Sequence, residues 1–327
     1  MPDTSDEQGP TVWLLTDNKP GHRNQLRGLA ERLEQRANAR AVWVDVSQYP
    51  IGRLAALLGR PPAMDLPRPD IIVAAGTGTH RLLLACRRRF GALCVVLMRP
   101  SFPLRWVDLA VVPAHDAPPR RTNVLVTRGV LNAVTPRTDP VSEHQALVLL
   151  GGPSKHYEWQ DEAILGQLDE LCRRYPDWTW TITSSRRTPE PLIQHLAAIA
   201  GGNVHYHHHD NTPPEWLPTQ LARARVAWVS PDSVSMVYEA ITAGASTGLF
   251  ELAATGDSRV VRGLQGLIQD GMVHPWPERD AVMAGRLPVS EPLWEADRAA
   301  CRVLDALAAH RDTHRPLTKE QPKDHQP

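Results

Sequence analysis

The chain has 327 residues, and its 36 lysines and arginines balance 36 aspartates and glutamates. This length predicts two domains of about 100 to 200 residues each, and the balanced charge excludes a global field that would attract nucleic acid or an anionic membrane. No apolar run reaches the roughly 18 residues of a membrane span, the acidic, polar start is not a signal peptide, and the four cysteines form no CxxC pair. We therefore expect a cytoplasmic protein, with peripheral contact to the inner face of the membrane left open.

Apolar strands alternate with helical segments after an N-terminal stretch, residues 1–10, that we expect to be disordered. This alternation is typical of a parallel sheet with crossover helices and predicts an α/β domain over residues 11–137. The predicted strands are Val12–Thr16, Ala41–Val46, Asp70–Ala75, Leu93–Met98, Leu109–Pro113 and Val124–Thr127, the last at an edge. The predicted helices are Asn24–Arg36 and Thr79–Phe90.

A polar, proline-rich stretch, TPRTDPVSE, separates this domain from a second one and predicts a linker at 138–145. The second domain, 146–290, has predicted strands at Ala146–Leu150, Trp178–Thr183, Asn203–His207, Val226–Val229 and Thr247–Phe250. Its predicted helices are Asp161–Arg174, Pro191–Ala200, Glu215–Ala224 and Val234–Ala243. A terminal helix is expected at 291–310, with a return to the first domain left open, and a disordered tail at 311–327.

Two loops of the first domain stand where a strand hands over to a helix. The first contains Asp17, Lys19, Gly21 and His22, and a histidine, with an ordinary pKa near 6.5, can accept a proton near neutral pH. The alternative is a helix cap and turn with a solvated histidine. The second loop contains Gly76, Thr77 and Thr79, which suit contact with an acceptor or a phosphate, although a plain turn is equally favoured.

Three loops of the second domain have the composition of a nucleotide site. Paired glycines let backbone amides approach a diphosphate, hydroxyls and arginine suit phosphate or base, and a helix start after a strand offers free N–H groups. The residues concerned are Gly151, Gly152, Ser154 and Lys155, then Ser184, Ser185 and Arg186, and finally Asp232, Ser233 and Ser235. Asp232 or Ser233 is expected to cap the helix, on which Glu239 is placed to receive ribose hydroxyls. The alternative for the Ser184–Arg186 loop is a solvated surface.

The run His205–Asp210 raises the question of a zinc site, since histidine is the commonest metal ligand. Consecutive residues of a strand point to opposite faces, so at most alternate histidines would share one ion. We therefore expect no metal site.

Three motifs together resemble a known family. WLLTDNKPGHRNQLRGLAERL, GGPSKHYEW and VSPDSVSMVYEAITAG follow one another over about Val12–Trp276 as they do in the mitochondrial-fission "elongated mitochondria" family, whose bacterial members are described as glycosyltransferases. The resemblance implies two Rossmann-like domains facing across a cleft, the fold called GT-B. The mechanism that this family implies resembles that of the N-acetylglucosaminyltransferase that makes the peptidoglycan lipid precursor. By this resemblance, Gly21 and His22 match a Gly-Gly-His loop of that enzyme, with Pro20 in place of a glycine. The same resemblance implies that Gly151, Gly152 and Ser154 match a Gly-Gly-Ser loop and that Glu239 matches a ribose-binding glutamate.

These observations predict a metal-independent glycosyltransferase that moves a sugar from a UDP- or GDP-sugar to an acceptor hydroxyl on a glycan or lipid-linked sugar. It would need no cofactor and no nucleic-acid partner. His22 would be the general base with Asp17 as its orienting partner, and Lys19, Gly21, Gly76, Thr77 and Thr79 would bind the acceptor. A nucleotide-sugar epimerase and a non-catalytic, fission-like adaptor are the alternatives, because fold alone does not separate them.

Overall fold

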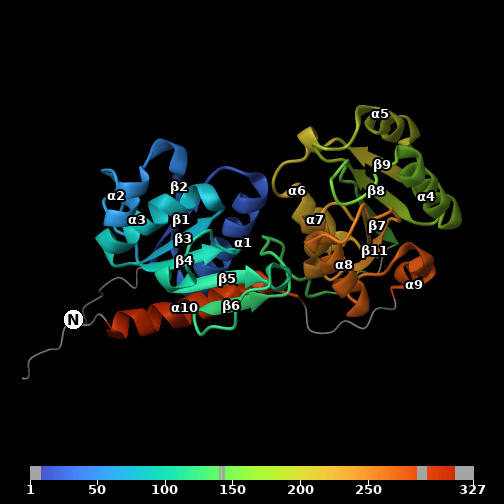
Figure 1. The fold of residues 1–327 in the computed structure, drawn as a ribbon. Helices are drawn as coiled ribbons and strands as arrows, with labels where there is room; N and C mark the ends of the chain where they lie inside the picture. Colours follow the sequence, from blue (N-terminus) through green and yellow to red (C-terminus); the bar gives the residue numbers. More distant parts are fainter. Residues whose placement is uncertain (1–8, 140, 142–143, 286–292, 314–327) are drawn as a thin grey trace, which may run out of the picture.

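The computed structural model describes residues 9–139, 141, 144–285 and 293–313. They form two domains that lie side by side, each built on a parallel sheet (Figure 1). The predicted α/β class is confirmed. The expected disorder of residues 1–8 and 314–327, and parts of the linker at 140 and 142–143, lie outside the described residues.

The first sheet has six parallel strands in the order β2-β1-β3-β4-β5-β6. The prediction of six strands in one sheet, with β6 at an edge, is confirmed. Its strands are β1 (Thr11–Thr16), β2 (Arg40–Asp45), β3 (Ile71–Ala75), β4 (Leu93–Leu97), β5 (Leu109–Pro113) and β6 (Val124–Thr127). Its helices are α1 (Pro20–Ala37), α2 (Arg53–Leu58) and α3 (His80–Phe90). Helix α1 begins at Pro20 and not at Asn24, because proline suits the first helical position. The six residues of α2 are too few to show a helical period.

Alternate residues of each first-domain strand feed two separate cores. Val12 and Leu14 of β1 pack with α1, whereas Trp13 and Leu15 pack with α3 on the other face. The strands are buried on both faces because helices cover both, which explains their nearly continuous apolar sequences.

The second sheet has five parallel strands in the order β11-β10-β7-β8-β9. Its strands are β7 (Gln145–Leu149), β8 (Thr179–Thr183), β9 (Val204–His207), β10 (Val226–Val229) and β11 (Ser246–Leu249), within a residue of the predicted bounds. Its helices are α4 (Asp161–Arg174), α5 (Glu190–Ile199), α6 (Trp216–Arg223), α7 (Val234–Ala243), α8 (Arg259–Gln269) and α9 (Arg279–Ala284). The sequence prediction missed α8, whose two glycines weaken the helical signal, and the short α9.

Short 3₁₀ turns follow several strands. They are η1 (Val46–Gln48), η2 (Thr77–Thr79), η3 (Leu104–Trp106), η4 (Ala114–Asp116), η5 (His209–Asn211) and η6 (Trp276–Glu278).

The terminal helix α10 (Glu295–Thr313) runs along the first domain, not the second (Figure 1). Ala299, Val303 and Leu307 join the core beneath α1, and Asp297 pairs with Arg32 at 2.7 Å. Residues 311–313, expected in the tail, are helical, while 291–292 of the expected helix lie outside the described residues. Residue 10 was also expected to be disordered, yet the Pro10 carbonyl accepts the Arg40 amide at 2.9 Å.

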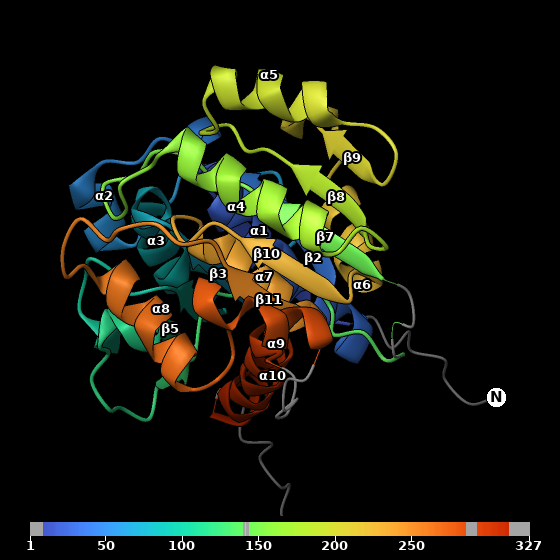
Figure 2. The same cartoon turned by 90° about the vertical axis from the view of Figure 1, so that its right-hand side faces the viewer.

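The two domains meet through α1 and α7 at one place and through η4 and α8 at another. Asn24 donates to Glu239 at 2.7 Å, and Arg259 pairs with Asp116 at 2.8 Å. Seen from the side of the second domain, α8 lies over the end of β5 (Figure 2). No helix in the described part of the chain is long and apolar enough to cross a membrane.

Candidate active site

A histidine–aspartate pair lies at the carboxyl end of β1. His22 Nδ1 is 2.7 Å from Asp17 Oδ1, and the Lys19 ammonium is 3.3 Å from Asp17 Oδ2. Because an ionised carboxylate only accepts, Nδ1 carries the proton of this hydrogen bond, and in the neutral form of the ring the lone pair is therefore on Nε2. His22 is held in the first turn of α1, not in a loop before the helix as predicted.

The acid–base character of the pair follows from its surroundings. Burial acts to raise the pKa of Asp17, but the hydrogen bond and charge of His22, together with Lys19, outweigh it and hold this pKa below its ordinary value. Asp17 is therefore charged near neutral pH and can orient the imidazole. The part of His22 in catalysis stays a prediction.

Gly76 directly follows β3, and its backbone packs closely against the side chains of His22 and Asp17. Its backbone has φ +89°, and a Cβ there would overlap the His22 ring and come within 2.9 Å of Asp17 Oδ2. Thr79 is fully buried and donates to the Gly76 carbonyl at 2.7 Å. The Thr79 hydroxyl is thus engaged in the turn in this conformation, and its contact with an acceptor stays a prediction. Gly21 is exposed, with no atom within 4 Å of its Cβ position.

A cavity of about 570 Å³ opens beside the pair and contains Thr77 in its wall. Tyr49, Ile51 and Leu82 make it partly apolar, while Arg81 adds a positive charge. Gly78, also in the wall, places its Cβ position 3.5 Å from Asp17 Cβ. Asp17 thus lies against Gly78 of this wall, although neither Asp17 nor His22 is itself a wall residue.

His80 is a further histidine here that the sequence analysis did not select. It is buried at the start of α3, with Nδ1 3.0 Å from Ser101 Oγ. Burial lowers its pKa, and the charge of nearby His22 lowers it further. The sequence feature that could have identified His80 is its position directly after the Gly-Thr-Gly-Thr loop.

The paired glycines of the second domain pack against protein atoms. The amide of Gly151 donates to Ser230 Oγ at 2.7 Å, and that of Gly152 donates to the Asp232 carboxylate at 3.1 Å. A Cβ on either glycine would overlap Asp232 or the Arg187 carbonyl. Both amides are therefore bonded to protein oxygens in this conformation, and their contact with a diphosphate stays a prediction. Ser154 Oγ accepts the His156 amide at 3.2 Å, and Lys155 is exposed.

The side chains of the loop after β8 also hydrogen-bond to protein atoms, and its arginine that contacts Asp232 is Arg187. Ser184 Oγ accepts from the Tyr206 hydroxyl at 2.9 Å, and Ser185 donates to the Gly151 carbonyl at 2.8 Å. Both Arg186 and Arg187 are exposed, and the Arg187 guanidinium lies 2.7 Å from the Asp232 carboxylate. The choice between the adjacent arginines could not be read from the sequence, since the turn decides which one reaches Asp232.

The start of α7 differs from the predicted cap. Ser233 occupies the N-cap position without a side-chain capping hydrogen bond, and Asp232 points to Gly152 and Arg187 instead. The other oxygen of Asp232, Oδ1, is buried without a hydrogen-bond partner among the described residues. Ser235 is exposed on the first turn of α7.

Glu239 is buried in the middle of α7, and its carboxylate faces the first domain. Oε1 accepts from Asn24 Nδ2 at 2.7 Å. Burial raises its pKa to about 7, although the Asn24 hydrogen bond and the Arg27 charge act in the opposite direction. Asn24 occupies one of the acceptor positions of this carboxylate, and the ribose role of Glu239 stays a prediction.

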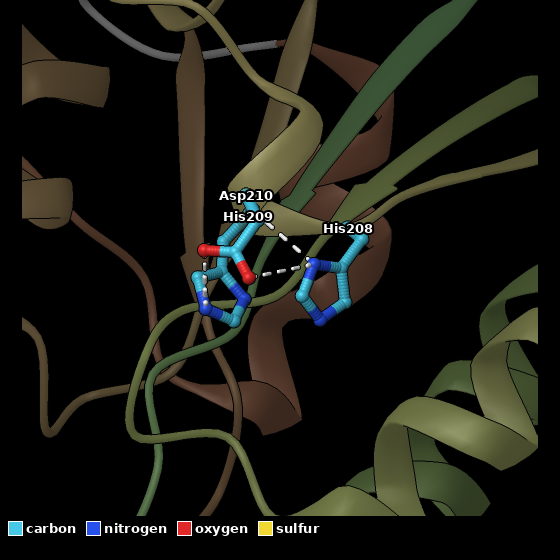
Figure 3. Close-up of side chains that lie close together, drawn as sticks. All are labelled: His208, His209 and Asp210. Atoms are coloured by element: carbon cyan, nitrogen blue, oxygen red, sulfur yellow. Dashed lines mark hydrogen bonds and ion pairs between the residues drawn. The ribbon is translucent and has the colours of Figure 1, made fainter.

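His208, His209 and Asp210 gather beyond β9, with ligand atoms within 4.8 Å of one another (Figure 3). Strand β9 ends at His207, so the alternation that was expected to separate neighbouring histidines does not apply to these three. That part of the prediction is wrong. The three offer fewer than the four ligands of a structural zinc, and His209 Nδ1 already lies 3.2 Å from Ser184 Oγ.

Comparison of the fold with solved structures shows several similar two-domain proteins. A proposed UDP-N-acetylglucosamine 2-epimerase from Listeria monocytogenes has a TM-score of 0.62 at 12% identity, covering 94% of this chain and 98% of that one. The Neisseria meningitidis UDP-GlcNAc 2-epimerase bound to UDP-GlcNAc scores 0.52 at 11% identity, with 91% and 99% covered. Acinetobacter baumannii MurG scores 0.51 at 16% identity, with 92% and 99% covered. These likenesses confirm the predicted GT-B arrangement of two Rossmann-like domains.

Sequence comparison adds the family. No curated protein matches the chain. The family described as mitochondrial fission ELM1, however, matches residues 20–307, which include α1 with His22, both glycine loops and most of α10. The chain therefore belongs to the mitochondrial fission ELM1 family.

Proposed function

We propose that the protein is a glycosyltransferase that moves a sugar from a nucleoside diphosphate donor to an acceptor hydroxyl without a resident metal ion. The observation that carries this proposal is the 2.7 Å pair of His22 and Asp17 beside a cavity of about 570 Å³. The pair is a base with an orienting carboxylate, and the cavity has the size of a small-molecule site.

In the proposed reaction, His22 Nε2 takes the proton of the acceptor hydroxyl while that oxygen bonds to the anomeric carbon of the donor. The bond from this carbon to the diphosphate oxygen breaks at the same time, and the nucleoside diphosphate leaves with the electron pair. Asp17 keeps Nε2 directed at the acceptor and stabilises the imidazolium that forms.

The donor is assigned to the second domain. A diphosphate would meet the Gly152 amide in place of the Asp232 carboxylate, and Arg187 would then be its cation. The bare Oδ1 of Asp232 would be free to accept a sugar hydroxyl. The UDP-GlcNAc bound to the Neisseria epimerase supports a UDP-sugar as donor.

The first-domain cavity also favours transfer over epimerisation, because an epimerase needs acids and bases around one sugar and no acceptor site. A fission-like adaptor would need neither. Product analysis separates these functions: transfer yields a new glycoside and free nucleoside diphosphate, whereas epimerisation yields altered sugar stereochemistry without an acceptor.

Membrane contact is assigned to α2. The side chains of Leu54 and Leu57 are 71% and 56% exposed, more than the other large apolar side chains described. Two arginines lie near them: Arg53 begins α2, and Arg88 of α3 packs beside Gly59 at the end of α2. Leucines flanked by arginines suit an anionic lipid surface. Leu54→Ser with Leu57→Ser should abolish flotation with phosphatidylglycerol vesicles, whereas Ile199→Ser on α5 should not. Equal flotation of both variants would remove α2 from this role.

The direct test of donor binding is calorimetry and thermal shift with UDP and GDP. A ligand at a hundredfold excess over its Kd should stabilise the folded protein by about 2.7 kcal/mol. No heat and no shift with either nucleotide at millimolar concentration would refute the proposal.

A further inference from the structure

A second cavity, of about 560 Å³, lies between the two domains, and its wall contains neither His22 nor Asp17. We call it the arginine pocket, since Arg99, Arg128, Arg259 and Arg262 line it, with Asp116 and Asp270 as its acidic residues. Arg99 and Arg128 follow β4 and β6 of the first domain, while Arg259 and Arg262 belong to α8 of the second. The cavity is therefore completed only when the domains meet.

The charges of the arginine pocket do not cancel. Arg259 pairs with Asp116 at 2.8 Å, and Arg262 pairs with Asp257, which is exposed and outside the pocket wall. Arg99 donates to the Asp116 carbonyl at 3.1 Å and Arg128 contacts Met272 Sδ. Within the described residues, neither of these two guanidinium groups has a carboxylate partner. The pocket thus carries positive charge that a bound anion could neutralise.

Helix α8 presents two glycines to this pocket, Gly263 and Gly266. Each interior helical glycine costs about 1 kcal/mol relative to alanine, so two on one face require a reason. Close packing is not the reason: no atom lies within 4 Å of the Gly266 Cβ position, and only His115 Cβ, at 3.8 Å, lies near that of Gly263. Neither has the positive φ that would demand glycine. The missing side chains leave the pocket wall open between Arg259 and Arg262.

We propose that the arginine pocket binds the phosphate or diphosphate group of a phosphorylated acceptor. A guanidinium group can bind a phosphoryl group through two parallel N–H···O hydrogen bonds. Several arginines contributed by two domains therefore suit a ligand group with more than one negative charge. The pocket volume admits a phosphorylated sugar. The first-domain side of the pocket follows β4, β5 and β6, whereas the loops assigned to the donor follow β7, β8 and β10. The identification of the ligand as the acceptor rests on the proposed function; the anion site does not.

Calorimetry of the full-length protein with inorganic diphosphate tests the site. Arg262→Gln and Gly266→Leu should each weaken binding at least tenfold, the first by removing charge and the second by filling the cavity. Gly266→Leu should not lower the melting temperature, because leucine is a good helix former and the space is open. Gly166→Leu, at an exposed glycine of α4 with equally open surroundings, is the matched control and should bind as the wild type does. Wild-type affinity in both pocket variants would overturn the proposal.

A second titration, with UDP already saturating, distinguishes acceptor from donor. Unchanged diphosphate affinity assigns the pocket to the acceptor, whereas displacement by UDP assigns it to the donor diphosphate and overturns the acceptor assignment. If UDP gives no heat while diphosphate binding still depends on Arg262 and Gly266, the glycosyltransferase proposal fails and the anion site stands.

Discussion

Glu239→Gln should make the protein more stable in alkaline solution and leave it nearly unchanged in acid. The pKa of Glu239 rises from 4.5 to about 7 in the folded protein, because burial disfavours the charge. Between these values the folded state keeps a proton that the unfolded state loses, so wild-type stability falls as the pH rises through this window. Each pH unit corresponds to about 1.36 kcal/mol, which gives an order-of-magnitude loss of 2 to 3 kcal/mol between pH 5 and pH 8.

Glutamine keeps the oxygen that accepts from Asn24 but cannot ionise. Urea unfolding of wild type and Glu239→Gln at pH 5 and pH 8 measures the difference, and the other titrating groups cancel between the two proteins. Glu162→Gln, at an exposed carboxylate of α4, is the control and should show no pH-dependent difference. A constant difference between wild type and Glu239→Gln at both pH values would refute the buried, proton-retaining carboxylate.

Three further predictions concern the candidate site. His22→Ala should lower turnover by about 10² to 10⁴ with nearly unchanged UDP affinity, and full activity of the folded variant would exclude it as the base. Arg187→Gln should destabilise the protein by about 1 to 2 kcal/mol, because the fully buried Asp232 side chain loses a cation that is itself 44% exposed, while Arg186→Gln should change urea stability by under about 0.5 kcal/mol. Equal effects of the two arginine variants would contradict the structure. Chelation with EDTA should leave turnover unchanged; a loss that zinc restores would instead implicate His208, His209 and Asp210.

The sheets and the placement of the loops could be predicted because they follow from local patterns. Apolar runs bounded by turn residues gave Leu109–Pro113 and Val226–Val229 with their exact bounds. Parallel strands bring their carboxyl ends to one edge, which is why Asp17, His22 and Gly76 could be expected together. Helices α2, α8 and α9 escaped prediction, since they are short or contain glycine at interior positions.

Hydrogen-bond partners could not be predicted in the same way, because they depend on side-chain directions across the fold. Glu239 sits on the predicted helix, but its partner, Asn24, is 215 residues away. Asp232 was expected to cap its own helix and instead bonds to the loops after β7 and β8. The arginine pocket combines residues that follow four strands of two domains, and no segment of the sequence contains more than two of its arginines.

The glycines show the limit of sequence interpretation most directly. A glycine in a strand-end loop indicates that something approaches the backbone, but the sequence does not say what. At Gly76 and Gly152 the approaching group is the protein itself, the His22 ring in one case and the Arg187 carbonyl in the other. At Gly266 no protein atom approaches, and a helical backbone gives no other reason for glycine. Gly166 of α4 is equally open, so open space beside a helical glycine does not by itself indicate a ligand. Gly263 and Gly266 differ because they lie in one pocket wall with arginines of both domains, and this combination supports an anion site at α8, separate from the donor diphosphate proposed at the Gly152 amide.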